Sequence, residues 1–182
     1  LAKVGGSRIF TELQLALQEA RPLPILERLQ ALGVLRAIHP RLTLSPETAA
    51  RFRAGGEVLT WYELLYLDER PAAWLVYLLL LLEARPAPEA RAVLRRLSPP
   101  PRAAALAAEG LHRLRSLVRL FLAARQLPPS QVHRWLAADR LEVLLALMAR
   151  MEAPALRKAI GDFLTQTRRV RPLLTGHDLR AL

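Results

Sequence analysis

The stretch RIFTELQLALQEARPLPILERLQALGVLRAIHPRL, residues 8–42, decides how the fold begins because it encodes a helical hairpin and a corner. Ile9 and Leu13 belong to an apolar stripe at helical spacing, so one side of the first helix faces a core. Pro22 disfavours helical geometry in the residue before it and ends that helix. A second helix runs to Gly33, where a left-handed cap is expected, and about one and a half further turns follow.

The rest of the chain also has a helical pattern. Residues 72–82 form an uninterrupted apolar run that predicts the most buried helix, and this run is far shorter than the roughly 20 residues that cross a membrane. A long helix is expected from Arg102 to about Gln126, and Gly55-Gly56 is expected to break an earlier one. No stretch alternates long enough to predict a strand. We therefore expect an all-α fold of about nine helices joined by short proline-rich turns, as an irregular bundle or a short α-solenoid-like array.

The positive charge lies in one half of the chain. The net charge is +11, yet residues 1–90 contain as many acidic as basic side chains, so the whole excess lies in residues 91–182. This asymmetry favours a polyanionic partner such as RNA over a general surface enrichment in arginine. The proline run at residues 99–101 coincides with the change in charge. We place a division there, between a neck and body region, 1–97, and a basic tail region, 98–182.

Two motifs in this chain resemble the class II tRNA nucleotidyltransferases, which include CCA-adding enzymes, A-adding enzymes and bacterial poly(A) polymerases. The first resembles an Arg-Ile…Glu-Leu helix followed by a Leu-x-x-Leu-Gly-x-Leu…Ile-x-Pro turn in the neck and early body of that family. The second, LTGHDL at residues 174–179, resembles a helix start in the family's tail. The residues that match the first motif are Arg8, Ile9, Glu12, Leu13, Leu29, Leu32, Gly33, Leu35, Ile38 and Pro40.

The resemblance implies a helical region without its catalytic head. Nucleotidyl transfer in this family requires two nearby carboxylates that hold metal ions, usually in an Asp-x-Asp motif, and the chain contains no such motif. We therefore expect this chain to be inactive alone and to lack cofactors, whereas the parent protein is expected to use Mg²⁺ with ATP or CTP in the head. Both ends of the chain are expected to continue in the parent protein.

Arginines are the main candidates for a binding surface. Several share helix faces, which predicts basic stripes that contact phosphates, although cations at a helix end also complement the helix dipole. Gly176 and the following amides are expected to approach a backbone phosphate. The candidate RNA-binding residues are Arg91, Arg95, Arg96, Arg115, Arg119, Arg134, Arg140, Arg168, Arg169, Arg171, His177 and Arg180.

Other chemistries have little support in the sequence. The four histidines lie far apart without paired ligand spacing, so no metal site is expected. There is no cysteine, which excludes disulfides and thiolate ligands and fits a cytoplasmic protein. Arg8 and Glu12 have the spacing of a surface ion pair, and the family resemblance implies instead a brace for the neck helix.

We therefore expect this chain to bind tRNA or another structured RNA. It would grip the acceptor and T arms through phosphate and shape contacts and would present the 3′ end to the head of the full-length protein. The alternative is a helical-repeat scaffold that binds another protein, in which the arginine excess has no role. No membrane association is expected.

Overall fold

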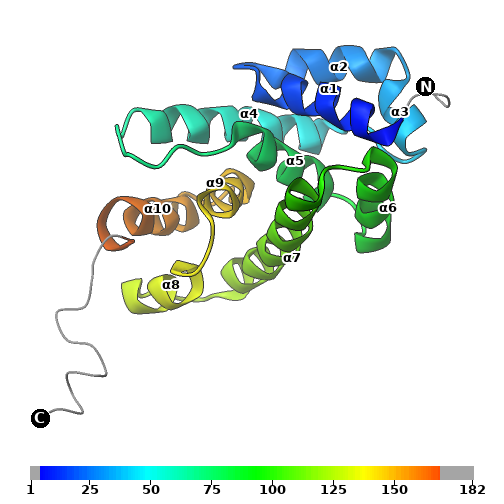
Figure 1. The fold of residues 1–182 in the computed structure, drawn as a ribbon. Coiled ribbons are helices and arrows are strands. Elements are labelled where there is room, and N and C mark those ends of the chain that lie inside the picture. The colour runs from blue at the N-terminus through cyan, green and yellow to red at the C-terminus, as the bar shows by residue number, and fades with distance from the viewer. Residues whose placement is uncertain (1–4, 169–182) are drawn as a thin grey trace, which may run out of the picture.

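The computed structural model describes residues 5–168, which form ten α-helices and one π-helical turn and contain no strand (Figure 1). This confirms the all-α prediction and comes close to the expected number of about nine helices. The elements are α1 (Gly6–Gln18), α2 (Pro22–Ala31), α3 (Val34–Ile38), α4 (Pro46–Glu63), α5 (Ala73–Glu83), α6 (Ala87–Leu97), α7 (Pro101–Ala123), α8 (Pro129–Leu136), α9 (Leu141–Arg150), α10 (Pro154–Asp162) and the π turn η1 (Phe163–Thr167).

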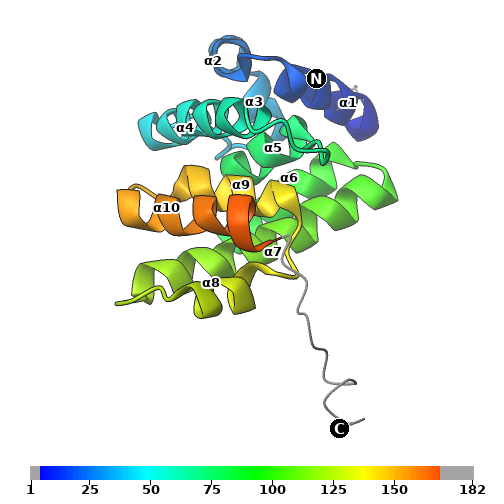
Figure 2. The same cartoon turned by 90° about the vertical axis from the view of Figure 1, so that its left-hand side faces the viewer.

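Helix α5 lies at the centre of the fold. Every residue from Trp74 to Leu82 is buried, as predicted for the apolar run, and α9 is buried to the same extent from Leu141 to Ala149. Helices α1, α4, α7 and α9 all pack against it. Figure 2 shows the resulting layers, with α1 and α2 at one end of the molecule, α4 and α5 beneath them, and α7 and α8 at the opposite end.

The hairpin and corner encoded by residues 8–42 form as predicted. Gly33 adopts a left-handed conformation with φ of 72° between α2 and α3, a backbone geometry that glycine adopts without steric cost. The Gln30 side chain then fixes the corner, because its amide oxygen accepts a hydrogen bond from the backbone N–H of Leu44. Ser45 caps α4 by accepting a hydrogen bond from the N–H of Thr48.

The predicted break at Gly55-Gly56 is wrong, because α4 continues without interruption from Pro46 to Glu63. Gly55 is buried where α4 crosses α5. A Cβ atom placed on Gly55 would lie 2.9 Å from Cδ1 of Leu80 and 3.2 Å from Cε1 of Tyr77. The glycine therefore permits two helices to approach closely, and α4–α5 packing offsets its low helix propensity.

Both sides of the proposed division at residues 97 and 98 contribute to one hydrophobic cluster. Helix α7 packs against α5, and α9 packs against both α4 and α5. Ser98 adopts a left-handed conformation at the end of α6 and turns the chain toward α7. The division into body and tail stays a prediction about sequence and charge. Within residues 5–168, no helix combines the length and apolar character needed to cross a bilayer.

We predict that Gly55→Leu destabilises the protein. The added side chain must displace Leu80 and Tyr77, both of which are almost fully buried, and such overpacking costs about 1–3 kcal/mol. Ala50→Leu is the matched control, because Ala50 is exposed on the same helix and should change the free energy of unfolding by less than about 0.5 kcal/mol. Urea denaturation followed by circular dichroism measures both, and equal stability of the two variants would contradict this account of Gly55.

Candidate nucleic-acid interface

Helix α6 presents two arginines to solvent. Ala90, Val93 and Leu97 bury the opposite side of the helix in the core, and Pro88 and Glu89 in its first turn favour a helix start. Arg91 and Arg95 lie one turn apart on the exposed side. The structure therefore places two of the predicted RNA-binding arginines on one open helix face.

Helix α7 contributes a second set of cations, of which only part is open to solvent. Leu111, Leu114, Leu117 and Phe121 belong to its buried side, while His112 and Arg119 are exposed. Arg115 is half-buried, and its guanidinium donates hydrogen bonds to the carbonyl oxygens of Leu82, at 2.9 Å, and Arg85. Arg115 thus ties α7 to the end of α5 and to the residues that follow it, and the Leu82 carbonyl also accepts from the backbone N–H of Arg85 at 3.1 Å.

The charges of arginines on α6 and α7 act on Arg115. Burial lowers the pKa of Arg115, Glu83 opposes this shift, and the charges of Arg91 and Arg119 lower the pKa further. The guanidinium groups of Arg91, Arg115 and Arg119 therefore lie within one another's field. We call Arg91, Arg95, Arg115 and Arg119 the α6–α7 arginine cluster.

The α6–α7 arginine cluster lacks bound counter-charges. Within residues 5–168, no carboxylate lies within ion-pair distance of any of its four members. Two acidic side chains near it are engaged elsewhere: Glu83 pairs with Arg51 and Arg150, and Glu89 pairs with Arg41. The cluster is consequently a region of uncompensated positive charge that can attract phosphates.

Arg85 links the α6–α7 arginine cluster to the chain between α3 and α4, a role that the sequence did not reveal. Its guanidinium donates to the carbonyl oxygens of Arg41, at 2.8 Å, and Thr43, while its own carbonyl accepts from Arg115. These bonds join α7, the end of α5 and the α3–α4 connection. The contacts span 30 to 44 positions in sequence, so no local spacing signals them.

The remaining predicted RNA-binding residues lie in different settings. Arg134 is exposed in the last turn of α8, and Arg96 is half-buried with interactions of its own. Arg140 lies 3.5 Å from the carboxylate of Glu142, and Arg168 lies 2.9 Å from that of Glu69. Arg169, Arg171, His177 and Arg180 fall outside the described residues.

Arg8 and Glu12 are both exposed on α1, and residues 5–168 contain no ion pair between them. Both line a groove of about 400 Å³ between α1 and the α2–α3 corner, whose other walls include Leu29 and Ile38. A role as a brace for this helix stays a prediction from the family resemblance.

Two further arginines hold helices together instead of facing a ligand. Arg113 of α7 donates to both carboxylate oxygens of Asp139, at 2.7 and 2.9 Å, and to the carbonyl oxygen of Trp135. This hydrogen bonding raises the pKa of Arg113. Arg150 shares the carboxylate of Glu83 with Arg51, so the pair connects α4, α5 and α9. Within the described chain, no three acidic or histidine side chains gather as a metal site does.

Comparisons with known proteins agree on one family. The chain is 33% identical over 186 residues to an A-adding tRNA nucleotidyltransferase of Geobacter sulfurreducens, and this match covers 100% of the chain and 21% of that protein. No family model matches the chain.

Solved structures share the fold of this chain. The apo form I of a tRNA-processing enzyme superposes with a TM-score of 0.75 and 26% identity, over 98% of this chain and 46% of that one. A CCA-adding enzyme with CTP has the same fold, with a TM-score of 0.75 and 16% identity, over 99% of this chain and 42% of that one. The chain thus spans between a fifth and half of the length of these relatives.

We predict that Arg113→Met lowers stability, because it leaves the carboxylate of Asp139, which is 6% exposed, without its partner. We expect a loss of about 1–3 kcal/mol, below the range for a fully buried pair because 37% of the Arg113 side chain is open to solvent. Arg134→Met makes the same change at an exposed position and should alter stability by less than about 0.5 kcal/mol. Thermal and urea denaturation measure both variants, and an unchanged Arg113→Met protein would exclude this role.

Proposed function

The chain belongs to the tRNA nucleotidyltransferase family, in which it matches a helical C-terminal portion, and on this premise we propose that it binds tRNA. The α6–α7 arginine cluster contacts the phosphates of the acceptor and T arms. Recognition depends on the shape and charge of the RNA and not on its base sequence. Binding in this way presents the 3′ end of the RNA to the catalytic head of the full-length protein.

The observation that carries this proposal is the state of the arginines in the cluster. Among the residues that the structure describes, Arg91, Arg95 and Arg119 are exposed and have no carboxylate partner, whereas Arg51, Arg113 and Arg150 are engaged within the fold. An arginine with no internal partner keeps its donors available for a phosphate. Arg115 contributes mainly through its charge, because its guanidinium already donates to backbone carbonyls.

The activity of the whole protein is also a proposal. By analogy with its relatives, it adds nucleotides to an RNA 3′ end, with Mg²⁺ and ATP or CTP bound in the head. The described residues carry the RNA and contribute no group to the chemical step. Whether the product is a CCA end, a single adenosine or a poly(A) tail depends on the head.

A second candidate function is a protein-binding scaffold. The observation in its favour is the groove between α1 and the α2–α3 corner, together with two exposed leucines, Leu15 at 53% and Leu32 at 61%. An apolar partner of this kind would bind with little dependence on salt, whereas RNA binding weakens steeply as salt rises. Salt dependence therefore separates the two functions.

The experiment is a fluorescence anisotropy titration of this chain with labelled tRNA, an unstructured RNA of equal length, and duplex DNA across a salt series. We expect tRNA to bind most tightly. Arg91→Glu with Arg119→Glu should weaken tRNA binding at least tenfold and reduce the salt slope by about 1.5–2, because two phosphate contacts are lost. Arg36→Glu with Arg53→Glu changes the net charge equally on exposed residues of α3 and α4 and should have a much smaller effect.

Two outcomes would contradict the proposal. Equal binding of the three nucleic acids, equally reduced by both double variants, would indicate only a generally basic surface. No binding at low salt would exclude an RNA-binding role for this chain and favour the scaffold.

A further inference from the structure

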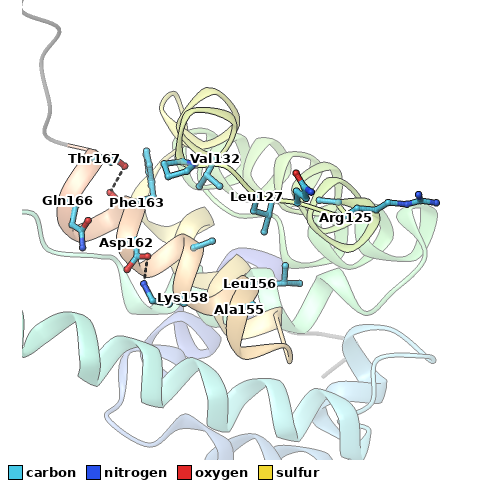
Figure 3. Close-up of a pocket in the computed structure, with 14 residues that line it drawn as sticks. Arg125, Leu127, Val132, Ala155, Leu156, Lys158, Asp162, Phe163, Gln166 and Thr167 are labelled. Carbon is cyan, nitrogen blue, oxygen red and sulfur yellow. Dashed lines mark hydrogen bonds and ion pairs between the residues drawn. The ribbon is translucent and has the colours of Figure 1, made fainter.

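A second recess lies beyond the end of α7. It has a volume of about 400 Å³ and is formed by the α7–α8 connection, α8, α10 and η1, as Figure 3 shows. Leu127, Val132 and Leu156 give it apolar walls, and two small residues, Ala155 and Ala159, leave space along α10. This volume lies within the range typical of small-molecule sites.

The edge of the recess is polar and mixed in charge. Two carboxamides, of Gln126 and Gln166, line it and can both donate and accept hydrogen bonds. Lys158 and Asp162 form an ion pair at 2.6 Å on the same side. Arg125 is exposed and lines the margin of the recess, and its side chain extends away from the recess in Figure 3.

The backbone beside the recess is unusual. After α10 the chain forms a π turn, in which the N–H of Arg168 donates to the carbonyl oxygen of Phe163 at 2.8 Å. Phe163, Gln166 and Thr167 of this turn line the recess. π-helical turns are uncommon in proteins, and this one ends α10 and shapes one wall of the recess.

The recess lies beyond the C-terminal end of α7, whose α8-facing side carries Arg113 and Phe121, while Arg119 lies on the other side of that helix. Arg119 and Arg125 are six residues apart, of which the first four steps are helical. A helical step of four residues spans about 6 Å and two further residues span at most about 7.6 Å, so the two Cα atoms lie within about 14 Å of each other. An RNA strand held at Arg119 can therefore reach the opening.

We propose that this recess binds the base of an unpaired nucleotide, whose phosphate lies at Arg125. The flat face of a base packs against the aliphatic walls, and its polar edge meets the carboxamides of Gln126 and Gln166, a combination that a purely apolar ligand would leave unused. This inference rests on the proposed RNA-binding function for the source of the nucleotide. The same chemistry would also admit a free mononucleotide.

The test compares two RNAs of equal length, a hairpin with an unpaired loop and a blunt duplex, and adds AMP and CMP as free probes. Ala159→Phe fills the recess, Gln166→Ala removes one carboxamide without altering the core, and Ala50→Phe adds the same bulk to an exposed position on α4. Circular dichroism establishes that each variant is folded. Anisotropy measures RNA binding, and ¹H–¹⁵N NMR shifts of residues 155–167 report the mononucleotides.

We expect the hairpin to bind roughly tenfold more tightly than the duplex. Ala159→Phe should remove this preference and leave the affinity for the duplex unchanged, Gln166→Ala should reduce the preference, and Ala50→Phe should retain it. Equal binding of hairpin and duplex by the folded wild-type chain would overturn the recess proposal and leave the arginine proposal intact. If neither RNA binds, the NMR shifts caused by AMP and CMP test the recess alone. Shifts of recess residues that Ala159→Phe abolishes support a nucleotide site, and the absence of such shifts overturns it.

Discussion

The fold depends on the burial of α5. A helix that is apolar on all sides must be covered on all sides, and no single neighbour can do this. Helices α1 and α4 from the first half of the chain and α7 and α9 from the second half surround it. The basic half of the chain is therefore part of the same core as the neutral half, although the charge changes abruptly between them.

This burial also determines where the charged groups lie. At the end of α5, Arg115 of α7 donates to the carbonyl oxygens of Leu82 and Arg85, and the Leu82 carbonyl also accepts from the backbone N–H of Arg85. The hydrogen bonds of a structural arginine thus fix the orientation of the helix that carries Arg119. The surface proposed to bind RNA is positioned by the same contacts that complete the core.

The sequence predicted features that depend on near neighbours and missed those that depend on distant ones. The stripe of α1, the left-handed cap at Gly33 and the apolar run of α5 follow from local spacing, and the structure confirms them. Gly55 was misinterpreted as a break because its reason, the close approach of Leu80, lies 25 positions away. For the same reason, a shared helix face could not distinguish Arg115, which donates to backbone carbonyls, from the exposed Arg119.

An excess of arginine is therefore a poor guide to a binding surface until the internal partners are known. Arg113 and Arg150 add to the net charge of the basic half, yet each is engaged by a carboxylate of the fold. Arg91 and Arg119 have no such carboxylate within residues 5–168, and they lie on neighbouring helices close enough for their charges to lower the pKa of Arg115. A folded protein gains no internal ion pair from cations left exposed in this way and accepts their mutual repulsion. A polyanion relieves that repulsion on binding, so the arrangement of these side chains favours an RNA ligand more strongly than the net charge alone does.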